Sequence, residues 1–150
     1  MKIFQGLEEL SSAAGTDLGY TEWVTIDQAR VNLFADATGD HQWIHVDPDR
    51  SVTGPFGGTI AHGLLTLSLL PVLLQELYRV DNVTMAVNYG FNKVRFPRPV
   101  PVGSTLRASA VIREVTQLDG AVQAVLVTTI EVDGSSKPAC VIESIVRYVA

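Results

Sequence analysis

The chain has 150 residues, of which 47% are hydrophobic and 18% charged, and its formal net charge at pH 7 is −5. This length and composition indicate one globular domain over residues 1–150 and not a disordered segment. The negative charge argues against broad binding to nucleic acids or anionic membranes. The one cysteine, Cys140, excludes an internal disulfide and a four-thiolate metal site, and its apolar neighbours favour a buried structural thiol.

Neither the N-terminal segment nor the longest apolar run suggests export or membrane insertion. The first 15 residues contain early acidic residues and no continuous apolar region, unlike a secretory signal. The longest apolar run, residues 64–74, is too short to span a bilayer. We therefore expect a cytoplasmic location and no membrane partner.

The first fifty residues predict short elements. We expect a short helix within residues 1–15, a strand over 18–26 and a helix that ends at Thr38-Gly39. Thr25 and Gln28 have the spacing of a capping box for that helix. In residues 46–54, Asp47 followed by Pro48 predicts the capped start of a helical turn.

Residues 61–79 are apolar on nearly every helical face, which predicts a helix buried on all sides and kinked at Pro71. The second half predicts four strands, over residues 85–96, 105–115, 121–132 and 139–149, with Asp-Gly hairpin signals between the later ones. The fold class is therefore α+β, an antiparallel sheet wrapped around a long central apolar helix. Its open sheet edges favour edge-to-edge pairing of two copies.

Residues 37–45, ATGDHQWIH, place an acid and an imidazole on a turn. Asp40 and His45, five residues apart, can hold a water molecule and exchange protons with it. The alternative is that Asp40 only caps a turn and His45 is an ordinary core histidine. A metal site is a further alternative, with His41 and His45 four residues apart and Asp40 or His62 as a third ligand.

Residues 61–63, AHG, open the apolar helix. Gly63 would let a ligand carbonyl approach the unpaired N–H groups of the first turn, which is how an oxyanion site is built. A simple helix start is the alternative. Together with Asp40 and His45, this helix start suits proton chemistry beside a carbonyl group.

The basic residues are unevenly placed. No acidic residue lies between Asp81 and Glu114, but five basic residues do, among them Lys93, Arg95 and Arg98. Such a cationic window predicts a small polyanionic ligand, for example a nucleotide or phosphopantetheine group. A solvated strand face is the alternative.

These motifs resemble those of the MaoC-like (R)-specific enoyl-CoA hydratases of the hot-dog fold, in particular mycobacterial-type single-domain hydratases. Gly39, Asp40 and His45 match the first family motif, and residues 61–63 match the second. A third match is FPRPVPVG at 96–103. The chain departs from the family at Gln42-Trp43, where an Asn-Pro pair is usual, and loses the stiffening of the turn by proline.

The resemblance implies syn addition of water to a trans-2-enoyl-CoA, giving a (3R)-hydroxyacyl-CoA in fatty-acid metabolism, in a homodimer and with no metal or redox cofactor. One division of roles makes Asp40 the base and His45 the acid, and the reverse is also open. The Gly63 N–H would stabilise the thioester oxygen. The CoA phosphates would bind Lys93, Arg95 and Arg98. We expect the acyl pocket to include two aromatic residues, Trp43 and Phe56.

Three other functions remain open at this point. The chain could dehydrate 3-hydroxyacyl groups on an acyl-carrier protein, which is the same chemistry in reverse. It could be a hot-dog acyl-CoA thioesterase, which would use a similar helix start. It could also be a non-catalytic thioester-binding module or the subunit of a dehydratase, although such a protein has no need of the Asp40–His45 pair.

Overall fold

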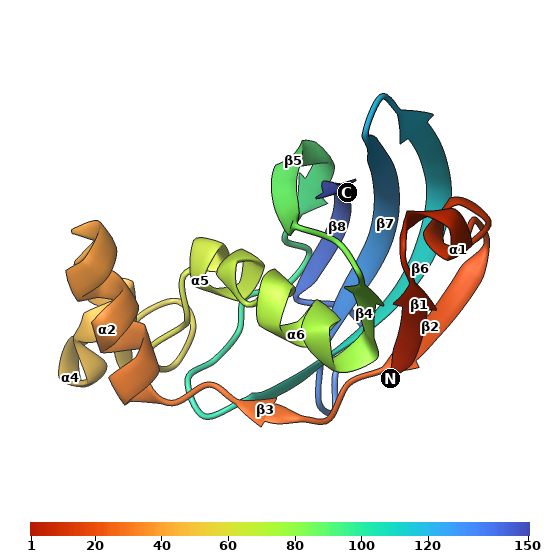
Figure 1. The fold of residues 1–150 in the computed structure, drawn as a ribbon. Coiled ribbons are helices and arrows are strands. Elements are labelled where there is room, and N and C mark those ends of the chain that lie inside the picture. The colour runs from red at the N-terminus through yellow and green to blue at the C-terminus, as the bar shows by residue number, and fades with distance from the viewer.

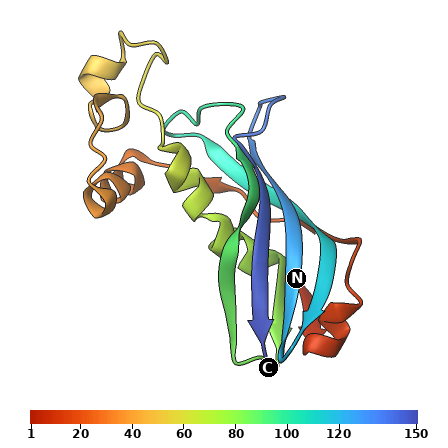
Figure 2. The same cartoon turned by 90° about the horizontal axis from the view of Figure 1, so that it is seen from above.

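The computed structural model describes residues 1–150 as a curved antiparallel sheet with a helical layer packed against one face (Figures 1 and 2). The sheet has six strands in the order β2-β6-β7-β8-β5, with β3 also paired to β6. These strands are β2 (Thr16–Tyr20), β3 (Val24–Thr25), β5 (Met85–Arg95), β6 (Thr105–Leu118), β7 (Ala121–Val132) and β8 (Cys140–Val149). The four predicted strands of the second half are confirmed, and the α+β hot-dog architecture with them.

Local turn chemistry and side-chain alternation explain these strands. Leu118 pairs with Ala121, so Asp119 and Gly120 form the two-residue connection of a hairpin, and Gly120 takes a positive φ of 69°, which glycine adopts without strain. Along β8 every second residue is buried. The buried face meets the helices, and the other face is partly exposed to solvent.

The helices are α1 (Leu7–Ser11), α2 (Gln28–Thr38), α3 (Trp43–Val46), α4 (Pro48–Ser51), α5 (Gly63–Ser68) and α6 (Leu70–Leu77). The expected Thr25–Gln28 capping box is wrong, because Asp27 is the N-cap of α2 and accepts the Arg30 N–H at 2.8 Å. The predicted cap of α4 is confirmed, since the Asp47 carboxyl accepts the Arg50 N–H at 3.0 Å. None of the helices is both long and apolar enough to cross a membrane.

The central helix is α5 followed by α6, interrupted at Leu69 just before Pro71. Buried leucines of both segments join the main core cluster, so the helix packs on the sheet as expected. The expectation that it is buried on all sides is wrong, because Leu64 and Val72 are 61% and 52% exposed. The sheet covers only one side of the helix, and the apolar sequence alone does not show what covers the other.

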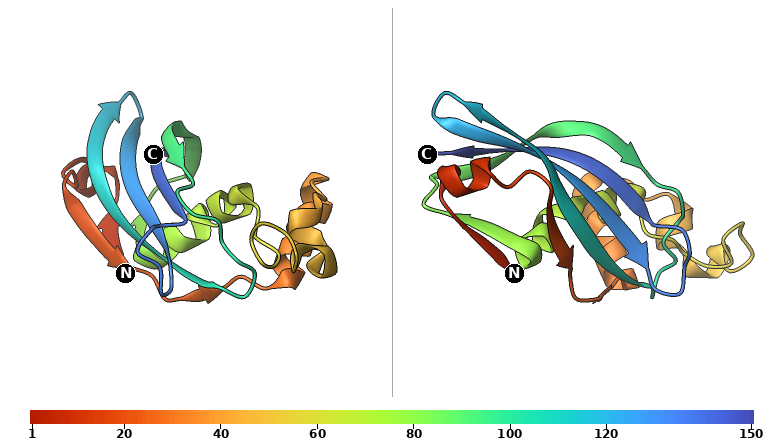
Figure 3. Two further views of the ribbon diagram at one scale, coloured as in Figure 1. Left: turned by 180° about the vertical axis from the view of Figure 1, so that it is seen from behind. Right: turned by 90° about the vertical axis from the view of Figure 1, so that its right-hand side faces the viewer.

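The N-terminus forms a second, two-stranded sheet that the sequence did not predict. β1 (Lys2–Gln5) pairs in parallel with β4 (Tyr78–Asp81), the strand that follows α6 directly. This sheet lies at the far end of the central helix, whereas α2, α3 and α4 lie beyond its start, as two further views show (Figure 3). The two ends of the central helix therefore have different surroundings.

Candidate active site

Asp40 lies on an exposed turn directly after α2. The helix ends at Gly39, whose φ of 81° is left-handed and reverses the chain. The turn is held weakly from within, because the Asp40 N–H reaches the Thr38 hydroxyl at 3.4 Å and the Asp40 carboxyl accepts the Gln42 N–H at 3.3 Å. The Asp40 side chain is 53% exposed, which leaves its carboxylate accessible to a water molecule or ligand.

His45 is the buried member of the predicted pair, with 7% of its surface exposed. Its Nδ1 lies 2.7 Å from the carbonyl oxygen of Ile60. A carbonyl oxygen only accepts, so Nδ1 carries the proton and the neutral ring has its lone pair on Nε2. The backbone of His45 is fixed as well, because the Gln28 side chain donates to its carbonyl at 2.7 Å. His45 is therefore held in one orientation and one tautomer.

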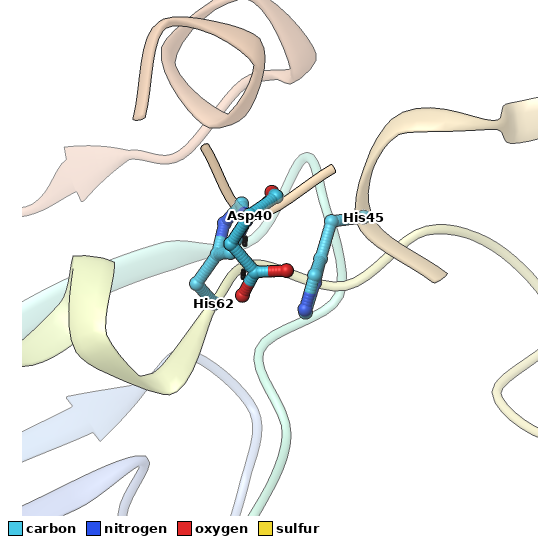
Figure 4. Close-up of side chains that lie close together, drawn as sticks. All are labelled: Asp40, His45 and His62. Carbon is cyan, nitrogen blue, oxygen red and sulfur yellow. Dashed lines mark hydrogen bonds and ion pairs between the residues drawn. The ribbon is translucent and has the colours of Figure 1, made fainter. Parts of the chain in front are cut away.

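His62 joins the pair from the start of the central helix. Its ring stacks on that of His45, with centroids 3.9 Å apart and planes 23° apart. Its Nε2 lies 2.9 Å from the backbone carbonyl oxygen of Asp40, while its Nδ1 is buried without a partner. Polar atoms of the Asp40, His45 and His62 side chains all lie within 4.8 Å of one another, and Figure 4 shows the Asp40 carboxyl pointing towards the two rings.

The stacked geometry does not suit a shared metal ion. An imidazole binds a metal through a lone pair in its own plane, and the nearly parallel planes of His45 and His62 do not meet at a common point near both rings. The backbone carbonyl on one nitrogen of each ring does not bear on this point, because a metal-binding imidazole commonly donates its other N–H to such a group. His41 takes no part, because its exposed Nε2 pairs with Asp36 at 2.9 Å and this contact raises its pKa above 6.5.

A pocket of about 310 Å³ lies between His45 and the start of α5. Gly63 and Phe96 meet in its wall, where a Cβ added at Gly63 would lie only 3.3 Å from the Phe96 ring. A side chain at position 63 would therefore force this aromatic ring to move. The lining is formed by His45, Phe56, Ile60, Ala61, Gly63, Thr66, Phe96, Arg98, Pro99, Val100 and Ala139.

The structure brings some of the predicted binding residues to this pocket and leaves others away from it. Phe56 and Arg98 line it. Trp43 does not, because its ring packs against Gly54 and under the Arg50 guanidinium, which lies 4.3 Å from the ring centroid. Trp43 therefore supports the loop that follows α4.

Lys93 and Arg95 project from the outer face of the sheet. Their neighbour Val94 packs on the core, and adjacent residues of a strand point to opposite faces. Lys93 pairs in register with Glu143, and its charge helps to lower the pKa of that carboxyl, although the Arg113 hydrogen bond is the main cause. Arg98 is thus the only one of the three predicted phosphate-binding residues at the pocket.

Several supporting residues were not predicted for these roles. Gln28, expected to cap a helix, instead links His45 to Thr59, whose hydroxyl donates to the Gln28 side chain at 2.7 Å. Thr66 lines the pocket, and its buried hydroxyl has no partner. His62 was named only as a possible metal ligand and as a member of the 61–63 motif. Their contacts join segments far apart in sequence, so no local pattern reveals them.

Comparisons with known proteins agree with this geometry. A family model described as a MaoC like domain matches residues 9–134. The 3-hydroxyacyl-thioester dehydratase Z of Mycobacterium tuberculosis is 61% identical over 151 residues, covering 100% of both chains. Nodulation protein N of Rhizobium meliloti is 45% identical, over 89% of this chain and 84% of that protein.

A solved structure is similar in fold and sequence. The (R)-hydratase from A. caviae involved in PHA biosynthesis superimposes with a TM-score of 0.73 at 26% identity, over 89% of this chain and 94% of that one. The helix-on-sheet architecture, the Asp40–His45 turn and these similarities lead to one conclusion. The chain belongs to the MaoC-like domain family and is a hydro-lyase of the hot-dog hydratase/dehydratase type.

Proposed function

We propose that the protein is an (R)-specific enoyl-CoA hydratase, which adds water to trans-2-enoyl-CoA and gives (3R)-hydroxyacyl-CoA. The observation that carries the proposal is the approach of the Asp40 carboxyl to the buried imidazole of His45, within 4.8 Å. One group is half exposed and the other opens onto a pocket. This arrangement suits a water molecule held between an acid and a base.

The proton transfers are assigned to Asp40 and His45 as a unit. Hydration requires that one proton leaves the water as its oxygen bonds to C3, and that one proton reaches C2. Neutral His45 offers the Nε2 lone pair as an acceptor, because Nδ1–H is bonded to Ile60. Asp40 is the second proton-exchanging group. Between them the two residues accept the proton that leaves the water and deliver one proton to C2, so the pair carries the same number of protons before and after the reaction. Because the two groups lie within 4.8 Å of each other, we assign both to one side of the substrate, and hydrogen and hydroxyl would then be added to the same face.

The thioester oxygen is assigned to the start of α5. Gly63 is the first residue of that helix and lines the pocket. The N–H of a first helical residue has no partner within its helix and lies at the positive end of the helix dipole. As negative charge develops on the thioester oxygen, a hydrogen bond from Gly63 would become stronger and favour the transition state.

Substrate binding is divided between the pocket and its basic surroundings. Phe56 supplies an aromatic wall for the acyl group, and Arg98 is a cation at the same pocket. The Arg98 guanidinium is steadied by a 2.8 Å hydrogen bond to Ser135. We assign the CoA phosphates to Arg98, with Lys93 and Arg95 on the outer sheet face as further cations along the same chain segment.

The proposed enzyme is a homodimer. β5 is an edge strand of the sheet, and an exposed strand edge is a template for pairing with another chain. Large apolar side chains are exposed on β5 and on the uncovered side of the central helix: Leu64, Val72, Met85, Val87, Tyr89 and Phe91. A second copy that pairs along β5 would cover them. Sedimentation equilibrium should therefore give the mass of a dimer, and the mass of a monomer would contradict this assignment.

Dehydration of a 3-hydroxyacyl thioester on a carrier protein is the second candidate. It is favoured by the name of the M. tuberculosis relative, a 3-hydroxyacyl-thioester dehydratase. The two reactions are forward and reverse directions of one equilibrium, so they require the same residues. The two candidates differ only in the group that carries the acyl chain, which is CoA in one and an acyl-carrier protein in the other.

The test uses crotonyl-CoA and crotonyl-acyl-carrier protein in parallel, with and without a metal chelator. We expect loss of the conjugated enoyl absorbance with crotonyl-CoA, chelator-resistant turnover and a (3R)-hydroxybutyryl product. A higher kcat/KM with the carrier protein would favour the second candidate. Release of free thiol from butyryl-CoA, with no hydration, would instead identify a thioesterase, and inactivity on every thioester would contradict both proposals.

A further inference from the structure

His62 occupies a helix position for which histidine is an unusual choice. It is the N-cap residue of α5, where Ser, Thr, Asp and Asn are preferred because their side chains accept the free N–H groups of the first turn. The His62 side chain makes no such bond. It is 3% exposed and faces the Asp40–His45 turn. Its contacts are therefore with the site and not with its own helix.

The contact to Asp40 is the shortest hydrogen bond that this turn residue makes. His62 Nε2 lies 2.9 Å from the Asp40 carbonyl oxygen, compared with 3.3 and 3.4 Å for the two bonds within the turn. The Asp40 carbonyl only accepts, so His62 carries its proton on Nε2. Residues 37–42 are all exposed, so this buried side chain ties an otherwise solvent-facing turn to the core.

The same ring also packs on His45. The centroid of the His62 ring lies 3.9 Å from that of His45 and 4.9 Å from that of Phe34. A displaced His62 would release Asp40, whose carbonyl is bonded to it, whereas His45 would keep its own bonds to Ile60 and Gln28. Productive proton transfer is sensitive to displacements of this kind.

We propose that His62 is a positioning residue, which fixes the Asp40 carboxyl relative to the His45 imidazole through its Nε2–H bond to the Asp40 backbone. It touches neither water nor substrate in this role. The inference rests on the proposed function, since it assigns His62 to the reaction performed by Asp40 and His45.

Two amide substitutions separate this role from simple packing. The amide nitrogen of glutamine occupies the place of the histidine Nε2, and that of asparagine occupies the place of Nδ1. His62→Gln therefore keeps a donor for the Asp40 carbonyl, whereas His62→Asn does not. Both remove the ring. His41→Ala is the matched control, because it removes an exposed histidine of the same turn that pairs with Asp36.

The measurement is kcat and KM for crotonyl-CoA, below the melting temperature of each variant. We expect kcat to fall about tenfold or more in His62→Asn and to return to within about threefold of wild type in His62→Gln. KM should change little in either, because positioning acts on the transition state. His41→Ala should match wild type.

A second readout does not depend on turnover. The carbonyl carbon of Asp40, observed by NMR in labelled protein, should shift in His62→Asn and stay near its wild-type position in His62→Gln. Equal kcat values for the two variants, or an effect confined to KM, would overturn the role of His62 in an active enzyme. A wild-type protein inactive on every thioester would overturn the proposed function, and the role with it, whatever the carbonyl shift shows.

Discussion

The two ends of the central helix differ in whether their buried polar groups have hydrogen-bond partners. At its start, His62 Nδ1 and the Thr66 hydroxyl are buried without partners, beside a pocket and an exposed carboxylate. At its far end, the buried hydroxyls of Tyr78 and Tyr148 bond to each other, and β1 pairs with β4, the strand that begins at Tyr78. Unpaired buried groups cost stability, so we expect the far end to contribute more to stability than the end that carries the proposed site.

Substitution of the pair at the helix start should have the largest effect. Asp40→Asn and His45→Gln each remove a proton-exchanging group. Asp40→Asn keeps the shape of the side chain, whereas His45→Gln removes the ring and keeps a polar group near the place of Nε2. Each should lower kcat about 10²- to 10⁴-fold. The melting temperature should change little for Asp40→Asn, because that side chain is half exposed. Turnover near the wild-type level in both variants would show that the chemistry lies elsewhere.

Loss of one tyrosine hydroxyl at the far end should affect stability and not turnover. Tyr148→Phe leaves the buried Tyr78 hydroxyl unpaired, which should lower the free energy of unfolding by about 1–3 kcal/mol. The double variant, in which Tyr78→Phe is added, removes both hydroxyls and should recover much of this loss. Urea unfolding measures both variants, and a double variant less stable than Tyr148→Phe would contradict the explanation.

Thr66→Val should have a smaller effect of the opposite sign. The Thr66 hydroxyl has no partner to lose, so its removal should leave the free energy of unfolding unchanged or raise it by up to about 1 kcal/mol. The same unfolding experiment tests it. A clear destabilisation would mean that the hydroxyl is paired, for example by a bound water molecule.

The smallest expected effect is a pH dependence at His41. The Asp36 hydrogen bond raises the pKa of His41 in the folded protein above 6.5. The resulting stabilisation is present below that pH and is lost as the pH rises through the folded-state pKa. The difference in melting temperature between wild type and His41→Gln should thus be larger in mild acid than in mild alkali. A difference that grows with pH would contradict this sign.

Local patterns were sufficient for much of the fold. The Asp119-Gly120 hairpin and the Asp47-Pro48 helix start depend on turn and cap chemistry within a few residues, and both are present as expected. The Asp40–His45 spacing on a turn was likewise visible in the sequence, because Gly39 ends the preceding helix. These features need no knowledge of distant residues.

Contacts between distant segments could not be predicted in this way. The pairing of β1 with β4 joins residues 76 positions apart, such as Lys2 and Tyr78. The hydrogen bond from the Gln28 side chain to the His45 carbonyl joins residues 17 positions apart. The exposure of Val72 has the same origin, because hydrophobicity shows that a residue favours burial and not which surface covers it.

The most direct test of the paired acid and base is the stereochemistry of hydration in D₂O. If Asp40 and His45 act from one side of the substrate, crotonyl-CoA should give a single 3R product with deuterium at C2 on the same face as the new hydroxyl. NMR of the product determines this relation. Deuterium on the opposite face, or a mixture of both C2 epimers formed during turnover, would contradict the account.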